Sequence, residues 1–304
     1  MSLLLEVVTQ ITLPIVVLAA GGYALQLWAR FDVQTLNRLL VYGTFPCFIV
    51  VTLSQATVPL GEVRGTAIFT ALQFFGLLAV GWWVGGLFKL PRPMRAVVAL
   101  ACAFPNSGNY GIPVAELAFG RDIVTHQVII TSVHTVVILM VAPLMLTGGD
   151  GGLKGQLKAM FQTPMIPAVM LGLGLNALDL RLPAVIETPM DMLGQAYVGV
   201  ALFALGAQLA TSRAKVDLGS AGLAIGARLL LAPLLTGLAL LVVPLPFEVK
   251  ALLFVGATAP VGVLLAIFAA EFRGNAELSS AVVIASTMLS PLFVTAALVI
   301  VRMW

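Results

Sequence analysis

The chain of 304 residues is strongly apolar and carries few charges. Hydrophobic residues make up 60% of it, and roughly 68% when the 29 glycines are counted and the 4 tyrosines left out, against about 45–50% in a soluble domain. Charged residues are 10% of the chain, where a soluble domain has about 25%. This composition excludes a soluble enzyme and a nucleic-acid-binding protein. The net charge of +3 comes from scattered cations that form no basic arm or stripe.

Apolar stretches long enough to cross a membrane recur along the whole chain. A hydrocarbon core about 30 Å thick requires about 20 helical residues. The first stretch is long, contains Glu6 and no Lys or Arg, and leads into further stretches, so we expect a first helix and not a cleaved signal peptide. The sequence predicts an all-α membrane protein with ten transmembrane helices, at residues 3–28, 39–57, 66–88, 95–119, 123–147, 163–178, 190–211, 218–243, 249–272 and 278–303.

Basic residues between these helices predict the orientation, because cytoplasmic loops are enriched in Lys and Arg. The odd-numbered loops hold ten: Arg30, Arg38, Lys89, Arg92, Arg95, Lys154, Lys158, Arg213, Lys215 and Arg273. The opposite face holds five: Arg64, Arg121, Arg181, Lys250 and Arg302. We therefore expect a multi-pass protein of the cytoplasmic membrane with both termini outside.

The ten predicted helices divide into two groups of five. Residues 1–147 form a first five-helix repeat, residues 148–162 a cytoplasmic linker, and residues 163–304 a second repeat. Because five is odd, the second repeat enters the membrane from the opposite side, as in the inverted repeats of many secondary transporters. A weak proline register agrees with this division: Pro14 with Pro164, Pro105 with Pro260, and Pro143 with Pro291.

The fourth predicted helix contains a segment that is unfavourable for a continuous helix. The sequence FPNSGNYGIP runs from Phe104 to Pro113, at mid-depth in the membrane. Its two prolines lack N–H donors and its glycines favour other conformations. The ninth helix has a comparable segment, GATAPVG, from Gly256 to Gly262. The pattern predicts two broken helices near the membrane centre, with simple proline kinks as the alternative.

Broken helices at the membrane centre form binding sites for small ions and polar substrates. The N-terminal ends of half-helices carry partial positive charge and the free carbonyls of the other halves coordinate cations. An anion or a zwitterion is therefore the expected guest. Asn106 is the first candidate to bind it, since an amide can donate to a carboxylate without a buried charge, and capping of a freed carbonyl is the alternative.

The FPNSGNYGIP segment resembles the fourth helix of the auxin efflux carrier family. The stretches beginning at Leu13 (LPIVVLAAGGYALQ), Leu36 (LNRLLVYGTFPCFIVVTLS) and Val200 (VALFALGAQLA) resemble its first, second and seventh helices. The resemblance implies an inverted repeat similar to sodium/proton antiporters and bile-acid symporters, with helices 4 and 9 crossing at prolines. It also implies an elevator-like movement of a transport domain against a scaffold.

The chain departs from the plant members in two respects. It has no long hydrophilic central loop, so it resembles the short bacterial members, for which malate, malonate and related organic anions are the suspected substrates. The ninth helix carries only Thr258 beside Pro260, where relatives have an amide. The substrate-binding candidates are Asn106, Ser107, Asn109, Thr258 and Gln208, and the helix-break candidates are Pro105, Gly108, Gly111, Pro113, Pro260 and Gly262.

Three ionisable residues at depth are candidates for coupling or counter-charge. Glu116 lies in the first turn after Pro113, where it either couples a proton or sodium ion or serves as a paired structural carboxyl. Arg228, within the eighth helix, is either the counter-charge of the anion or half of an ion pair. His134 is either a proton relay or a hydrogen-bonded core residue.

Three polar residues near the end of the second predicted helix either line a cavity or bond a neighbouring helix: Thr52, Ser54 and Gln55.

These patterns favour a secondary transporter of small organic anions, with a channel or a non-transporting sensor on the same scaffold as the alternative. We expect the lipid bilayer, a proton or sodium ion and a second copy of the chain as partners, and no nucleic acid. Neither a Walker sequence nor an HExxH or paired-cysteine motif occurs, so we expect no cofactor and no metal. A hydrolase built on Ser107 and His134 is disfavoured because the sequence has no G-x-S-x-G elbow.

Overall fold

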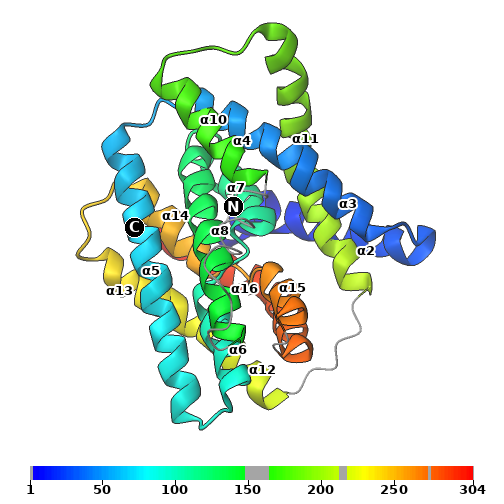
Figure 1. The fold of residues 1–304 in the computed structure, drawn as a ribbon, viewed down its shortest axis with the longest axis vertical. Coiled ribbons are helices and arrows are strands. Elements are labelled where there is room, and N and C mark those ends of the chain that lie inside the picture. The colour runs from blue at the N-terminus through cyan, green and yellow to red at the C-terminus, as the bar shows by residue number, and fades with distance from the viewer. Residues whose placement is uncertain (1–2, 148–163, 212–217, 273–274, 304) are drawn as a thin grey trace.

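The computed structural model describes residues 3–147, 164–211, 218–272 and 275–303, and helices make up nearly all of these ranges (Figure 1). One isolated β-bridge is the only extended pairing in this part of the chain. The elements in chain order are α1 (Leu3–Val7), η1 (Val8–Thr12), α2 (Leu13–Ala29), α3 (Val33–Leu39), η2 (Leu40–Thr44), α4 (Phe45–Ser54), α5 (Leu60–Leu87), α6 (Arg92–Ala103), η3 (Ser107–Gly111), α7 (Ile112–Phe119), α8 (Val124–Thr147), α10 (Met165–Ala177), α11 (Ala184–Thr211), α12 (Leu218–Gly226), η4 (Ala227–Leu231), α13 (Ala232–Leu240), α14 (Phe247–Ala257), α15 (Leu264–Glu271) and α16 (Ala276–Arg302).

Seven helical segments of the described residues are long and apolar enough to cross a membrane. They are Leu3–Ala29, Val33–Ser54, Gly61–Leu87, Val124–Leu146, Ala184–Thr211, Gly219–Leu240 and Ala276–Arg302. The predicted sixth helix is shorter, since α10 has 13 residues and therefore extends about 20 Å. The expectation of an all-helical, multi-pass membrane protein is confirmed. The predicted linker, residues 148–162, lies outside the described residues.

Prolines shape four of the helices in the same way. Each of the elements η1, η2, η3 and η4 is a single turn of π-helix that ends two residues before a proline. The four prolines are Pro14, Pro46, Pro113 and Pro233. A proline has no N–H to donate and its ring collides with the carbonyl one turn earlier, so the preceding turn widens. These π-turns were not predicted from the sequence, although the prolines are their signal.

The predicted fourth and ninth helices are both interrupted. The first half-helix, α6, ends at Ala103 and the chain resumes at η3, while α14 ends at Ala257 and α15 begins at Leu264. The two interruptions meet as an antiparallel β-bridge between Pro105 and Val261. The backbone N–H of Asn106 donates to the carbonyl of Pro260 (2.7 Å), and that of Gly262 donates to the carbonyl of Phe104 (3.0 Å). Backbone groups freed by the prolines are thus satisfied across the crossing, as a low-dielectric surrounding requires.

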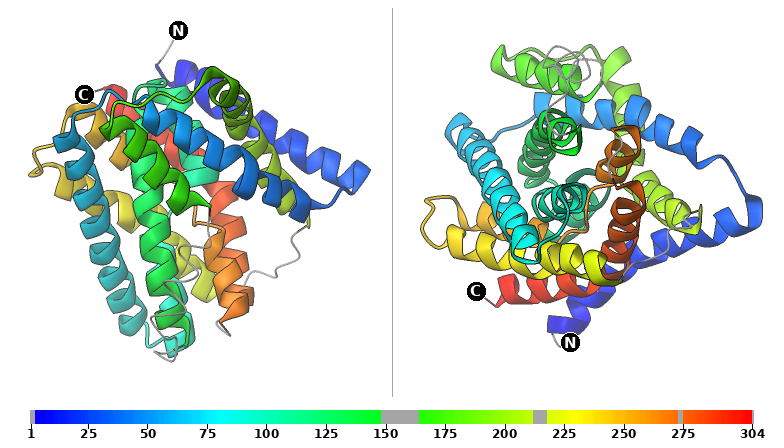
Figure 2. Two further views of the ribbon diagram at one scale, coloured as in Figure 1. Left: turned by 45° about the horizontal axis from the view of Figure 1, so that its top comes forward. Right: turned by 60° about the horizontal axis from the view of Figure 1, so that its bottom comes forward.

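The helices pack as two groups. The panel, defined as residues 3–54 and 165–211, is held by contacts of α2 with α11 and of α4 with α10 and α11. The bundle, defined as residues 60–147 and 218–302, contains both broken helices, and Figure 2 shows it beside the panel. The panel touches the bundle mainly at η3, α7, α8 and α16. The broken helix α6–η3–α7 therefore lies at the boundary between the groups.

Close backbone contact joins the helices of the panel. A side chain added at Gly22 of α2 would meet the backbone of Phe203, and one added at Gly206 of α11 would meet the backbone of Ala19. Small residues at such contacts are typical of helix pairs in membranes. The glycines of the first and seventh predicted helices therefore set the packing of α2 on α11.

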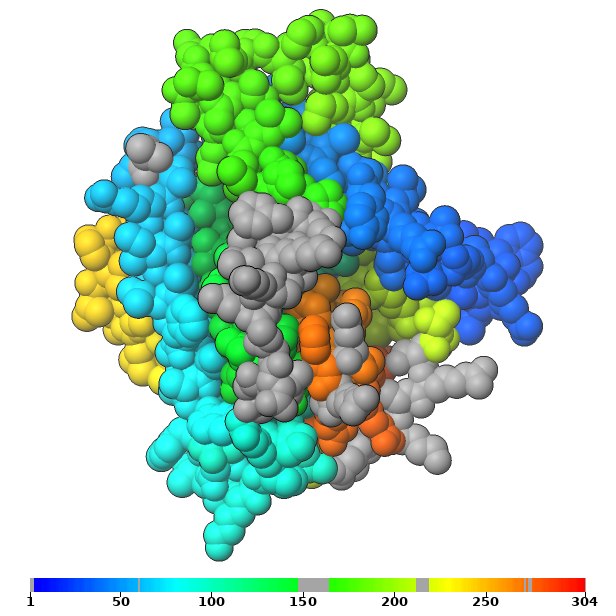
Figure 3. Space-filling view, in the orientation of Figure 1, coloured from blue at the N-terminus to red at the C-terminus, as the bar shows by residue number. Residues whose placement is uncertain are grey.

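The outer surface is apolar, as a lipid-facing surface must be. The end of α2 projects from the rest of the molecule at the right of Figures 1 and 3. Trp28 at this end has 82% of its surface exposed, and Leu72 on α5 has 66%. The largest core cluster combines small residues of α6 with side chains of α8, α12 and α16.

Candidate functional site

The crossing brings together four half-helix ends. The C-terminal ends of α6 and α14 arrive at it, and η3 and α15 leave it. Helix C-termini carry partial negative charge and N-termini partial positive charge. The crossing therefore has both an electronegative and an electropositive side.

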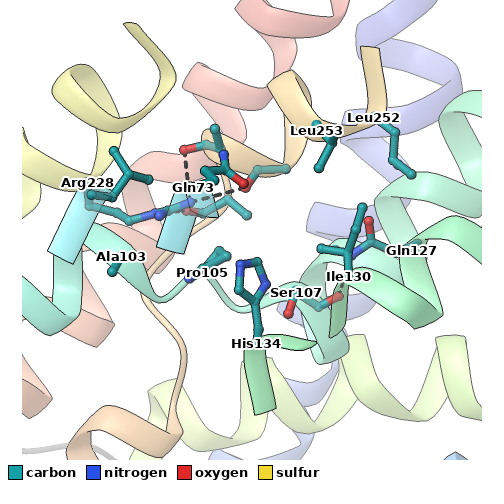
Figure 4. A pocket seen from close by; sticks show the side chains of 15 residues that line it. Gln73, Ala103, Pro105, Ser107, Gln127, Ile130, His134, Arg228, Leu252 and Leu253 are labelled. Carbon is teal, nitrogen blue, oxygen red and sulfur yellow. Dashed lines mark hydrogen bonds between the residues drawn. The ribbon is translucent and has the colours of Figure 1, made fainter. Parts of the chain in front are cut away.

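Arg228 of η4 binds the electronegative side. Its side chain is 1% exposed, and its three guanidinium nitrogens donate to carbonyls of both broken helices. Figure 4 shows Arg228 and its bonds to the ninth helix. Nε donates to Ala259 (3.0 Å) and Nη1 donates to Cys102 (2.9 Å), while Nη2 donates to Gly256 (3.2 Å) and Ala257 (2.9 Å). The guanidinium thus caps the ends of α6 and α14 together.

Arg228 was predicted to be either the counter-charge of the anion or half of an ion pair, and its contacts bear on both roles. Among the described residues no ion pair includes it, so the predicted acidic partner is not found there. Its carbonyl partners instead offset a burial that costs about 2.5–3.5 kcal/mol on translocon-insertion scales. A role of this charge toward a bound anion stays a prediction.

Asn106 lies in the interruption itself and keeps a free donor. The residue is 7% exposed, and its backbone N–H and carbonyl bond to Pro260 and Gly111. Its side-chain Nδ2 is buried without a hydrogen-bond partner. The alternative role, in which the amide caps a freed carbonyl through this nitrogen, does not occur in the structure. A buried donor of this kind is costly unless a ligand or water accepts from it.

Two side chains of α8 hold the second half of the broken helix in place. Gln127 Nε2 donates to the carbonyl of Ser107 (2.8 Å), and the hydroxyl of Thr131 donates to the same carbonyl (3.0 Å). Gly111 lies so close to Gln127 that an added Cβ would be 2.6 Å from Nε2. Neither residue was predicted from the sequence, although their spacing of four on an apolar helix is a signal for a shared polar face.

Ser286 plays a similar part at the other interruption. Its hydroxyl accepts from the backbone N–H of Val261 (3.0 Å) and donates to the carbonyl of Val283 (3.0 Å). The side chain of Phe104 covers Gly262, which leaves no room for a Cβ there. Ser286 was also missed, because a single serine in an apolar helix gives no distinctive sequence signal.

A cavity of about 20 Å³ adjoins the crossing. Ser107, His134 and Arg228 are among its lining residues, and Figure 4 shows His134 beside Pro105 and Ser107. The His134 Nδ1 atom is buried and has no hydrogen-bond partner. A volume of this size holds one water molecule, which needs about 10–15 Å³, and is too small for an organic acid. The crossing is therefore closed around its polar groups in this structure.

A larger cavity of about 290 Å³ separates the panel from the bundle. It lies between α4 and α11 on one side and α7 and α8 on the other, and Thr52 and Gln55 line it. Gln55 also donates to Glu187 of α11 (2.6 Å), so both alternatives apply to this residue. Its charged lining residues are Glu116, Arg121, Asp122 and Asp191. Three carboxyl groups against one guanidinium do not favour an anion. This cavity is wide enough for a small solute but lacks the charge of an anion-binding site.

The remaining candidates occupy different environments. Asn109 Oδ1 accepts from the hydroxyl of Tyr197 on α11 (3.2 Å), a buried residue that stacks on Phe45. Thr258 donates its hydroxyl to the carbonyl of Val255 (2.7 Å). The hydroxyl of Thr258 and the amide oxygen of Asn109 are thus engaged within the protein, whereas the buried amide nitrogen of Asn106 is not.

Gln208 and Glu116 lie away from the crossing. Gln208 donates to Asn37 of α3 (2.7 Å), and it follows Tyr197 by a helical distance of about 16 Å. Glu116 pairs with Arg121 (3.3 Å) at the larger cavity, as its paired-carboxyl alternative anticipates. The described residues contain no cluster of His, Cys, Asp and Glu that could hold a metal ion.

The fold and site together define a multi-pass membrane transport protein, since paired broken helices that cross at the membrane centre are typical of secondary transporters. The model of a family described as "Membrane transport protein" matches residues 7–154 and 152–298. The chain belongs to this family, in agreement with its resemblance to the auxin efflux carriers.

Curated relatives are also named as transporters. A transporter of Methanothermobacter thermautotrophicus, named only as uncharacterized, is 26% identical over 297 residues, which cover 93% of this chain and 94% of the relative. The uncharacterized transporter YfdV of Escherichia coli K12 is 24% identical over 216 residues, or 66% and 68% of the two chains. A putative malonate transporter of Rhizobium meliloti is 25% identical over 284 residues, or 88% and 86%.

Proposed function

We propose that this protein is a secondary carrier that moves small organic anions, such as dicarboxylates, across the cytoplasmic membrane. The observation that carries the proposal is the unpartnered, buried amide nitrogen of Asn106 at the crossing of the broken helices. The amide donor, the starts of η3 and α15 and the charge of Arg228 make the crossing favourable for a carboxylate. The name of the Rhizobium relative supports a dicarboxylate as the first substrate to test.

The proposed architecture is ten helices in two inverted repeats of five, the fourth and ninth being the broken pair. Seven spanning segments, the shorter α10 and the two interrupted helices support it. Two family-model matches that meet near the predicted linker agree with a division into halves. The same proposal places both termini outside and includes a proton or sodium ion as coupling ion and a homodimer.

The proposed mechanism is an elevator-type alternation in which the bundle moves against the panel. The 290 Å³ cavity lies at the boundary between the two groups and supports their movement as separate bodies, because the groups are not closely packed there. The small cavity at the crossing supports a step that opens it, because an organic acid does not fit there in the present arrangement.

Asn106→Ala should lower saturable malonate counterflow in proteoliposomes at least about tenfold at substrate concentrations below saturation, and Asn106→Asp should lower it further by repelling the anion. Loss of one hydrogen bond to a charged group, about 1.5–3 kcal/mol, weakens binding about ten- to a hundredfold. Gln34→Ala, which removes an exposed amide at the start of α3, is the control and should transport at the normal rate.

Counterflow at the wild-type rate in both Asn106 variants would remove the site assignment. Unitary currents without saturable counterflow would instead identify a channel. Absence of both currents and flux for all dicarboxylates tested, in correctly inserted protein, would leave a sensor on a transporter scaffold.

A further inference from the structure

Three separate helical segments converge on the guanidinium group of Arg228. Cys102 belongs to α6, Gly256 and Ala257 belong to α14, and Arg228 itself belongs to the π-turn η4. Hydrogen bonds run from η4 to both half-helices, with donor–acceptor distances of 2.9–3.2 Å. Arg228 is thus the side chain through which the eighth predicted helix fixes the ends of the fourth and ninth.

The carbonyls that Arg228 binds would otherwise need another partner. A helix leaves its last carbonyls without intrahelical donors, and in a low-dielectric interior each one requires a hydrogen bond or a cation. Carbonyls that converge from unwound helices in membrane transporters are typical ligands for small cations. In this protein the guanidinium already occupies the place on which they converge, with all three nitrogens engaged.

The positive charge at this place is not cancelled by a neighbouring acid. Within the described ranges the ion pairs are Arg121 with Glu116, Arg302 with Glu6, and His126 with Glu62. The charge of Arg228 is therefore balanced by helix ends alone, which carry about half an elementary charge each. Its planar, always protonated group suits this task better than a lysine, which is a point charge.

We propose that Arg228 is a positioning residue that acts as the built-in cation of the crossing, holding the ends of α6 and α14 together in place of a bound metal ion. The crossing then keeps its shape in the absence of sodium, and a substrate anion meets a positive charge that is already present. The inference rests on the proposed function only in taking the crossing as the place where substrate binds.

The wild-type protein gives the first test, which needs no substrate. Its melting temperature in detergent should be the same in sodium, potassium and choline chloride at equal ionic strength. A saturable rise in melting temperature with sodium that choline does not produce would overturn the proposal, because a bound metal ion would then contribute to the fold. Of the two coupling ions proposed above, this inference therefore requires the proton.

Substitutions at Arg228 give the second test. Arg228→Ala should lower the melting temperature by at least about 5 °C, since it leaves several buried carbonyls without donors. Millimolar guanidinium should restore most of this loss saturably, by refilling the vacated space. Arg228→Lys should fall between the wild type and Arg228→Gln, because an ammonium group cannot reach all four carbonyls at once.

Arg95→Gln is the matched control. Arg95 also donates to a carbonyl, that of Trp82 (2.6 Å), and its guanidinium stacks on the indole ring of Trp82. Unlike Arg228, it lies half-buried at the start of α6. Guanidinium should not raise the melting temperature of this variant or of the wild type.

Restoration by guanidinium in Arg228→Ala alone supports the proposal, whereas a folded Arg228→Ala without restoration overturns it. If Arg228→Ala does not fold, two other measurements test the proposal: the order of melting temperatures of Arg228→Lys and Arg228→Gln, and the wild-type melting temperatures in the three chloride salts. All these melting measurements are made without substrate. Their failure would leave the proposed function untouched, and failure of the Asn106 counterflow test would leave the role of Arg228 untouched.

Discussion

The two asparagines of the FPNSGNYGIP segment lie three residues apart and have different surroundings. Asn109 accepts a hydrogen bond from Tyr197, whereas the Asn106 Nδ2 atom has no partner. The sequence placed both in one motif and could not separate them, because Tyr197 lies on a helix distant in the chain. An unpartnered buried donor can be satisfied by a ligand or by water, so the proposed site rests on Asn106 first.

At the scale of single residues, Gly262→Ala should destabilise the crossing. Phe104 covers this glycine, and the Gly262 N–H bonds to the Phe104 carbonyl, so an added methyl group displaces the ring or lengthens the bridge. Overpacking of this kind costs about 1–3 kcal/mol, or about 2–10 °C in melting temperature. Thermal unfolding followed by fluorescence measures it.

Gly256→Ala is the control for this substitution, since an added Cβ there has nothing within 4 Å. Equal melting temperatures for Gly262→Ala and Gly256→Ala would contradict the close contact with Phe104.

At the scale of elements, prolines account for both the predicted helix breaks and the unpredicted π-turns. The interruption between α6 and η3 follows from Pro105, and the one between α14 and α15 contains Pro260. The π-turns before Pro14, Pro46 and Pro233 have the same cause but a milder outcome, because the helix continues. Whether a proline breaks or only widens a helix depends on the partners available to the freed groups, which the sequence does not show.

Packing of α2 on α11 gives a prediction at this scale. Gly22→Ala should lower the melting temperature by several degrees, because the new methyl group would overlap the backbone of Phe203, which cannot move as a side chain can. The adjacent Gly21→Ala should leave it unchanged, since nothing lies within 4 Å of a Cβ there. Identical unfolding curves for the two variants would show that α2 and α11 are farther apart than described.

At the scale of the whole molecule, the proposed orientation places the connections on defined sides. Phe88, directly after α5, is 64% exposed and is the last residue before a loop predicted to be cytoplasmic. Leu180, after α10, is 52% exposed and lies in a loop predicted to be outside. The two positions are matched in exposure and apolar character, so they are suited to a labelling experiment.

A cysteine introduced at Leu180 should react with a membrane-impermeant maleimide in intact cells, and one at Phe88 only after permeabilisation. Replacing Cys47 and Cys102 by serine or alanine first gives a background without native thiols. The opposite labelling pattern would invert the proposed topology, since the difference between the faces rests on ten basic residues against five.

The sequence by itself determined the class of protein, most of the helices and the place where two of them break. Those features follow from local composition: long apolar runs require a membrane, and prolines remove backbone donors wherever the chain folds. The tertiary structure alone decided which groups meet at the breaks. It paired Pro105 with Val261, engaged Arg228 with carbonyls and left Asn106 with a free donor, because such contacts join residues far apart in the chain.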